Sequence, residues 1–200
     1  MRATASAAQE TTDATVASAY NRRMQQPARE MRRILVAGVS GVGKTTLANR
    51  ISRATGIPHT EIDALQHGEN WTPRETFAHD VERFTREEQW ITEWQYREVR
   101  PLLAERADTL VWLDLPTSLT MSRVIRRTFR RRVRREELWN GNIEGPLWTF
   151  FTERDHIIRW AWRTRRTWRR HVAEAAAEHP CLRIVRLRST AEVARWLNSL

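Results

Sequence analysis

Short segments with strand-like patterning alternate along the chain with segments whose apolar residues recur at helical spacing. Alternation of this kind is typical of a parallel sheet that is covered by helices on both faces. We expect five strands, over residues 34–38, 57–62, 90–92, 109–113 and 182–187. The pattern therefore predicts a three-layer α/β fold, in which a five-stranded parallel sheet lies between two layers of helices.

Capping and helix-breaking residues locate the helices between these strands. The helix that begins at Lys44 is expected to end before Gly56. Thr72, followed by Pro73 and Glu75, has the pattern of a capping box and predicts the start of the next helix. Further helices are expected over 96–106, from about 153 to 178, and over 190–197.

The chain has 200 residues, which is the size of one domain. Residues 1–30 are rich in Ala, Thr, Ser and Gln, so we expect a flexible N-terminal tail before a folded domain over 31–200. Met31 is a second candidate for the start of translation. No apolar run reaches the roughly 20 residues of a membrane-spanning helix, and Cys181 is the single cysteine. These features exclude an intrachain disulfide and predict a cytoplasmic protein without a membrane partner.

Residues 38–45 carry the most specific motif in the chain. They read Gly-Val-Ser-Gly-Val-Gly-Lys-Thr and match the pattern G-x-x-x-x-G-K-[ST] between a predicted strand and a predicted helix. The glycines allow tight turns, so that backbone N–H groups converge on a phosphate at the start of the helix. Lys44, the only lysine, is expected to reach the β- and γ-phosphates, and Thr45 to offer its hydroxyl to Mg²⁺. We therefore predict a site for ATP or another NTP with Mg²⁺, formed by Gly38, Ser40, Gly41, Val42, Gly43, Lys44, Thr45 and Thr46.

Two acidic residues are expected at the carboxyl ends of strands, where ligands bind in open α/β sheets. We interpret Glu93 as a magnesium ligand and Asp63 as a group that binds the phosphate acceptor, although either could instead be a solvated acid at a strand end. Trp71 is a candidate wall of the acceptor pocket. We interpret Asp114 as structural and His67 as an ordinary surface residue.

Arginine dominates the positive charge, and the formal net charge is +10 at pH 7. Codon bias accounts for most of this excess, but two arginine-rich segments flank a Gly- and Asn-containing loop. We expect them to form a lid over about residues 128–158 that closes over phosphates. Binding of the same arginines to a nucleic-acid backbone is an alternative. We interpret Trp168, in the second segment, as a packing residue in preference to a base-stacking one.

Several motifs together resemble one family of bacterial proteins. They are the P-loop at 38–45, Ile62-Asp63-Ala64-Leu65, Trp71-Thr72-Pro73, Leu113-Asp114-Leu115-Pro116, the segment 136–142 (Glu-Glu-Leu-Trp-Asn-Gly-Asn) and the segment 158–163 (Ile-Arg-Trp-Ala-Trp-Arg). Over about residues 31–198 the chain is similar to the adenylate-kinase-like P-loop proteins called topology modulation proteins. This resemblance implies a fold like that of the nucleoside monophosphate kinases, with a helical arginine-rich lid.

The resemblance also implies roles for individual residues. It places Arg97 at the acceptor phosphate and Arg188 near the donor base. It implies a catalytic set that surrounds the donor phosphates, namely Lys44, Arg123, Arg127, Arg159 and Arg163. One departure stands out, because the family usually has Asp-Gly-Asn where this chain has Glu93-Trp94-Gln95. Trp94 is therefore expected to reshape the acceptor pocket.

The sequence as a whole favours a phosphotransferase that moves the γ-phosphoryl group of ATP to a small acceptor similar to a nucleoside monophosphate. Two alternatives stay open. The first is a nucleic-acid-associated NTPase or regulator that uses the arginine-rich face, and the second is an ATP-binding protein without transferase turnover.

Overall fold

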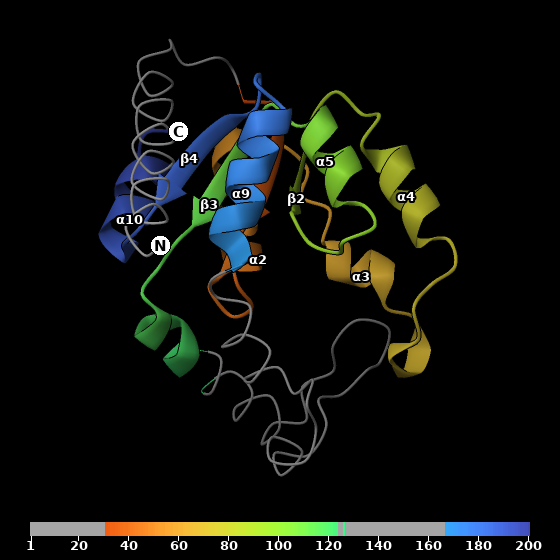
Figure 1. Cartoon of the computed structure of the whole chain (residues 1–200), viewed down its shortest axis with the longest axis horizontal. Coiled ribbons are helices and arrows are strands. Elements are labelled where there is room, and N and C mark those ends of the chain that lie inside the picture. The colour runs from red at the N-terminus through yellow and green to blue at the C-terminus, as the bar shows by residue number, and fades with distance from the viewer. Residues whose placement is uncertain (1–30, 124–125, 127–166) are drawn as a thin grey trace, which may run out of the picture. The chain divides into compact units, whose positions relative to one another are not determined.

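The structure is a computed structural model, which describes residues 31–123, 126 and 167–200 (Figure 1). The predicted tail, residues 1–30, and the predicted lid, about 128–158, lie outside this part of the chain. In the described part, no helix has the length and apolar character needed to cross a membrane.

Four parallel strands form the sheet in the described part of the chain, in the order β2-β1-β3-β4. They are β1 (Arg33–Ala37), β2 (Trp90–Glu93), β3 (Thr109–Leu113) and β4 (Arg183–Leu187). One of the two inner strands, β1, pairs with β2 and β3 on its two sides, so that Ile34 faces Ile91 and Thr109. Since all four strands run in the same direction, their carboxyl ends lie at one edge of the sheet, the carboxyl edge.

The prediction of a fifth strand over 57–62 is wrong. This segment makes a single bridge beside β2, from His59 to Ile91. Two backbone hydrogen bonds hold the bridge: Thr60 N donates to Ile91 O (2.9 Å), and Ile91 N donates to Pro58 O (2.8 Å). The ladder stops there because the next available amide, that of Ile62, donates to the side chain of Glu93 and starts a helix.

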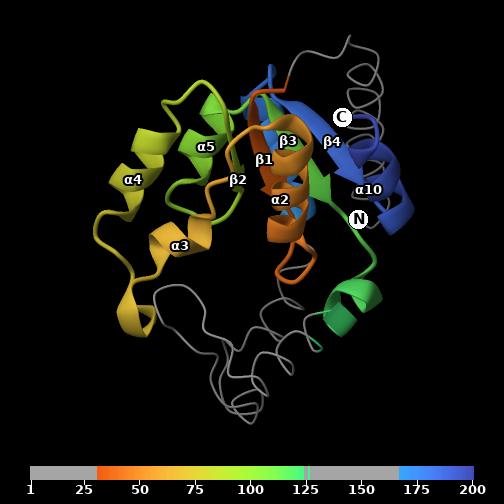
Figure 2. The same ribbon diagram turned by 180° about the vertical axis from the view of Figure 1, so that it is seen from behind.

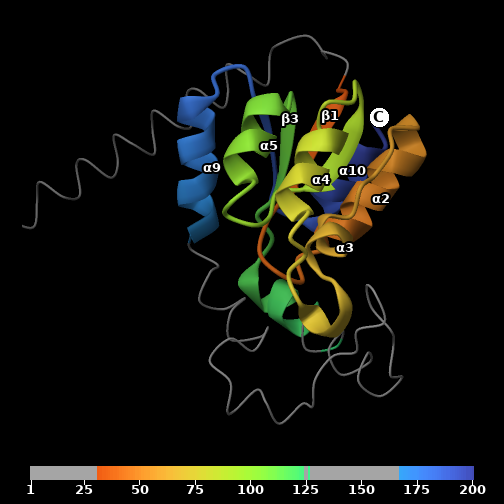
Figure 3. The same cartoon turned by 90° about the vertical axis from the view of Figure 1, so that its right-hand side faces the viewer.

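Helices cover both faces of the sheet. Figures 2 and 3 show α2 and α10 on one face and α5 and α9 on the other, as the sequence predicts. Their bounds are α2 (Lys44–Thr55), α5 (Arg100–Arg106), α9 (Thr167–Glu178) and α10 (Thr190–Leu197). Successive residues of a strand face opposite sides, and the core on the α5 and α9 side includes Leu35, Trp112 and Trp168. Trp168 is therefore a packing residue, as predicted.

Three shorter elements lie between α2 and β2. They are α3 (Ile62–Gln66), a 3₁₀ turn η1 (Glu69–Trp71) and α4 (Phe77–Phe84). The predicted helix start at Thr72 is wrong: its hydroxyl donates to Glu69 O (2.6 Å) within η1, and α4 begins four residues after Pro73. The helix predicted over 96–106 begins late, at Arg100, because Tyr96 has a φ of 57°, which a right-handed helix does not allow.

A pair of glycine substitutions tests how closely the loop after β1 packs on β3. A Cβ added to Gly38, whose φ is 145°, would lie 2.9 Å from Leu113 O and 2.9 Å from Val42 Cγ1. A Cβ added to Gly56, whose φ is 76°, would meet nothing within 4 Å. We expect Gly56→Ala to cost only backbone strain, roughly 1 kcal/mol, and Gly38→Ala to cost roughly 3 kcal/mol or more, because steric overlap adds to the strain. Urea denaturation of both variants measures this difference, and equal losses would contradict the close packing.

Candidate active site

The loop between β1 and α2 has the shape that phosphate binding requires. Gly41 and Gly43 have positive φ values of 76° and 106°, and Gly43 caps the amino end of α2. The loop therefore directs backbone N–H groups and the positive end of a helix toward one point. Lys44 is only 8% exposed, and its ammonium group donates back across the loop to Val39 O (3.3 Å). A positive charge is thus held against the inside of the loop.

A second cation approaches the loop from another element. Arg123 lies on the helix that begins at residue 117, directly after β3. Its Nη1 donates to Val42 O (3.1 Å). Arg126, on the same helix, is exposed. Arg123 therefore lies beside the P-loop, whereas Arg127, Arg159 and Arg163 lie outside the described residues.

Glu93, the last residue of β2, is buried directly beside the loop. Its Oε2 accepts a hydrogen bond from Ile62 N (3.2 Å), and its Oε1 lies 3.4 Å from His59 Nε2. Burial alone would raise the pKa of Glu93, but His59, the Thr45 hydroxyl and the Ile62 amide together lower it below its ordinary value. Glu93 is therefore an anion in contact with the threonine that is predicted to bind Mg²⁺.

These residues fit a magnesium ion of the kind that phosphotransferases use. Mg²⁺ prefers oxygen ligands and usually takes only one or two from the protein, the rest coming from water and substrate phosphates. Thr45 and Glu93 supply such oxygens. Apart from the ion-pair contact with His59, the buried Glu93 Oε1 makes no hydrogen bond to a described residue. The described part of the chain holds no cluster of three or more His, Cys, Asp or Glu residues that could bind a metal ion.

Asp63 belongs to a second polar cluster at the carboxyl edge. Its Oδ1 accepts two hydrogen bonds, from Tyr96 Oη (2.6 Å) and from Gln95 Nε2 (3.0 Å). Tyr96 Oη also lies 3.1 Å from His67 Nε2. Burial and the charge of Asp63 raise the pKa of Tyr96 well above its ordinary value, so the phenol keeps its proton. His67 is half-buried and hydrogen-bonded, which corrects its interpretation as an ordinary surface residue.

Aromatic rings line the side of this cluster. The ring of Trp71 meets that of His67 edge-to-face at 5.3 Å between centroids, and Tyr96 meets Phe77 in the same way at 5.2 Å. Trp71 is 39% exposed and, like Tyr96, has a left-handed backbone conformation, with φ of 59°. Trp71 therefore lies beside the cluster that contains Asp63.

Four other residues named in the sequence predictions follow the carboxyl ends of strands, and in the described part of the chain none of them forms a hydrogen bond with the P-loop or the Asp63 cluster. Arg97 is exposed in the loop between β2 and α5, and Arg188 is exposed directly after β4. Trp94 does not reshape a pocket: it is 4% exposed, its Nε1 donates to Arg100 O (3.0 Å), and it packs on the α9 side of the core. Asp114 forms an ion pair with Arg186, in agreement with a structural role.

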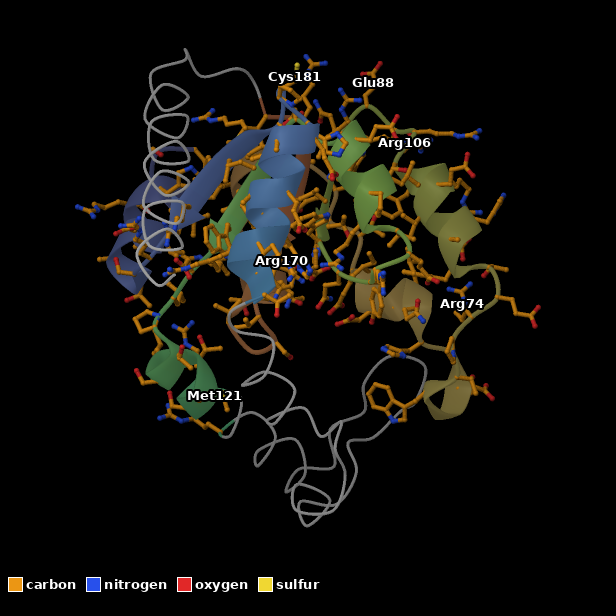
Figure 4. All side chains as sticks on the ribbon, in the orientation of Figure 1. Arg74, Glu88, Arg106, Met121, Arg170 and Cys181 are labelled. Carbon is orange, nitrogen blue, oxygen red and sulfur yellow. The ribbon has the colours of Figure 1, made fainter. Side chains whose placement is uncertain are left out.

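A separate small pocket with a volume of about 50 Å³, partly open to solvent, lies on the α9 side of the P-loop. It is lined by Val39, Trp112, Leu113, Asp114, Leu115, Thr117, Thr120, Met121 and Trp168. Figure 4 shows Met121 on the short helix after β3, near the carboxyl edge, whereas Glu88 and Cys181 lie at the opposite edge of the sheet. The pocket shares Val39 with the P-loop and contains none of the residues of the Asp63 cluster.

Sequence reasoning missed four residues of the site: His59, His67, Gln95 and Tyr96. Two of them, Gln95 and Tyr96, follow Glu93 directly, so their position after a predicted strand was a usable signal. The contacts of His59 and His67 depend on the bridge to β2 and on α3, and neither feature has a pattern in the sequence.

Comparisons with known proteins bear on the fold more than on the function. No family model matches the chain. The ATP-dependent protease ATPase subunit HslU of Methylorubrum extorquens is 30% identical over 118 residues, 57% of this chain, and that of Sinorhizobium fredii is 32% identical over 133 residues, 61% of this chain. These alignments cover 26% and 30% of the relatives, so the chain spans less than a third of the length of the curated relatives it matches.

Among solved structures, shikimate kinase from Acinetobacter baumannii, in complex with shikimate, superposes with a TM-score of 0.52 at 12% identity. The match covers 84% of this chain and 90% of that chain. A gluconokinase from Sinorhizobium meliloti is also similar, with a TM-score of 0.44 and 20% identity over 86% of this chain and 96% of that one. The superposition on the shikimate kinase shows that the described domain has the α/β fold of P-loop kinases, with a parallel sheet.

The ionisation of Glu93 gives a prediction for stability. Because its pKa in the folded chain lies below the ordinary 4.5, the ionised carboxylate stabilises the fold above about that pH, and this contribution is lost as the pH falls through the lowered value. We expect Glu93→Gln to lower the free energy of unfolding near neutral pH and to weaken its decline in acid. Urea denaturation across this pH range measures the effect.

Glu88→Gln, at an exposed position, serves as the control and should leave the wild-type curve unchanged. A Glu93→Gln curve that coincides with the wild-type curve at every pH would show that the buried carboxylate has no stabilising interactions.

Proposed function

We propose that the protein is an ATP-dependent phosphotransferase that acts on a small hydroxyl-bearing acceptor. The observation that carries the proposal is the buried Lys44 inside a glycine loop, next to a Thr45–Glu93 contact. A loop of this kind holds the β- and γ-phosphates of a nucleotide, and the Thr45–Glu93 pair supplies oxygens on the side where Mg²⁺ binds. The fold supports the same proposal, because a shikimate kinase, which is a small-molecule kinase, is among the solved structures that it resembles.

The acceptor would bind at Asp63, at the same edge of the sheet as the P-loop. One oxygen of Asp63 is held by Tyr96 and Gln95, and the other, Oδ2, makes no hydrogen bond to a described residue. A carboxylate in this arrangement accepts a hydrogen bond from a hydroxyl group, which orients the hydroxyl oxygen for attack on the γ-phosphorus. Trp71 would form the outer wall of this pocket.

Catalysis would then consist of positioning and of neutralising charge. Thr45 and Glu93 would hold Mg²⁺, which would offset part of the negative charge of the phosphates. Lys44 and Arg123 approach the same phosphates from α2 and from the helix after β3. We further propose that Arg127, Arg159 and Arg163 act from a lid, that Arg97 and Arg188 contact acceptor and nucleotide, and that the chain is a member of the topology modulation group.

A coupled assay of ATP consumption tests this function. The acceptor panel should include nucleoside monophosphates and small hydroxylated compounds, with shikimate and gluconate among them. We expect at least one acceptor to stimulate ATP consumption, and Lys44→Ala to lower the stimulated rate by about 100-fold or more, because the phosphates lose their buried cation. If ATP binds but no acceptor stimulates turnover, the chain is an ATP-binding protein without transferase activity and the proposal is wrong.

The contact of Arg123 with the P-loop gives a second prediction for the same assay. We expect Arg123→Met to lower kcat by roughly 10- to 100-fold, because a cation beside the transferred phosphoryl group is lost. Arg126→Met, on the exposed side of the same helix, should keep wild-type turnover. Equal effects of the two substitutions would mean that Arg123 acts only through general surface charge.

A further inference from the structure

The hydrogen bonds around Asp63 have a direction. Tyr96 has one hydroxyl proton, and its shortest contact, 2.6 Å, is to Asp63 Oδ1, so Tyr96 donates to the carboxylate. The phenol oxygen then accepts a hydrogen bond from His67 Nε2, 3.1 Å away. His67 therefore donates to Tyr96, and Tyr96 donates to Asp63.

The backbone stores strain to hold Tyr96 in this position. A φ of 57° is rare for an aromatic residue, and it strains the backbone. The ring is fixed from two sides, by Phe77 at 5.2 Å and by His67 at 6.1 Å between centroids. Strained residues of this kind persist where the surrounding structure fixes them, and they cluster at functional sites.

Among the described residues, hydrogen-bond donors reach only one oxygen of the carboxylate, Oδ1, and the other oxygen is proposed to bind the ligand. Both Tyr96 and Gln95 bond to Oδ1, and Asp63 is only half-buried. A carboxylate without these donors would rotate about its side-chain torsions, and a small displacement of a group that orients a reactant is costly to the rate. Fixing Oδ1 therefore fixes the direction in which Oδ2 points.

We infer that Tyr96, supported by His67, is a positioning residue that holds Asp63 with Oδ2 directed at the hydroxyl group of the acceptor. The inference rests on the proposed function for the role of Asp63, and it adds two residues that the sequence motifs do not assign. Tyr96 does not touch the reacting atoms and takes no proton from them. Its effect on the reaction passes entirely through the orientation of Asp63.

Steady-state kinetics with the acceptor found in the assay above test this role. Tyr96→Phe removes the hydroxyl and keeps the ring that packs on Phe77, so the fold should be preserved. We expect kcat to fall about 10-fold or more while the KM for ATP stays within about twofold, because only the acceptor side loses its orientation. His67→Gln keeps an N–H donor and should retain most of the activity, whereas His67→Leu should resemble Tyr96→Phe.

A spectroscopic titration tests the contact without any acceptor. The chain has two tyrosines, so Tyr20→Phe leaves Tyr96 as the single one. Tyrosinate absorbance should then be absent up to about pH 11, above the ordinary value of about 10. Adding Asp63→Asn removes the charge that opposes ionisation, and the absorbance should appear at lower pH. If Tyr96 in the Tyr20→Phe chain ionises at the ordinary tyrosine pKa of about 10, the inference is wrong.

The outcomes separate this inference from the proposed function. If the wild-type chain turns over an acceptor and Tyr96→Phe matches it in kcat, the positioning role is wrong and the proposed function stands. If no acceptor is turned over, the proposed function fails and the positioning role fails with it. If Tyr96→Phe and His67→Leu lose kcat, and His67→Gln retains it, the positioning role is supported.

Discussion

The parallel pairing of β1 with β2 on one side and β3 on the other is the constraint on which the site depends. This register brings the ends of the three strands to one edge, where the P-loop follows β1, Glu93 ends β2, and the helix that carries Arg123 follows β3. Glu93 and Arg123, which follow the P-loop by about 50 and 80 residues in the sequence, thereby lie beside that loop. A shift of one residue in the register would turn Glu93 to the opposite face and separate it from Thr45.

Glu93 links the two halves of the proposed site. Its carboxylate is buried between Thr45, which belongs to the nucleotide side, and Ile62 N, which starts the helix that contains Asp63. A buried carboxylate is stable only when donors and positive charge offset its loss of hydration, so it restricts where both neighbours can lie. The family that the sequence resembles usually has aspartate at this position. The longer side chain of Glu93 reaches the segment at 57–62, which makes only one bridge to β2.

The sequence predicts correctly those elements that have strong local signals. The P-loop lies between β1 and α2, and the burial of Trp168 follows from its position in an amphipathic helix. The failures have physical reasons. Residues 57–62 have strand-like composition, but their backbone makes only one bridge to β2. The amide of Ile62, at the start of α3, then donates to the side chain of Glu93, which lies 31 residues away in the sequence. The contacts of Asp63 with Tyr96 and His67 depend on a left-handed residue, and no composition rule predicts that an aromatic residue adopts this conformation.

Titration calorimetry with Mg²⁺ and ATP tests the central claim, that Lys44 inside the glycine loop holds the phosphates of a nucleotide. The wild-type chain should give saturable heat with one nucleotide per chain, and Lys44→Ala should abolish that heat under the same conditions. An absence of heat with the wild-type chain, or equal binding by the Lys44→Ala variant, would contradict the account.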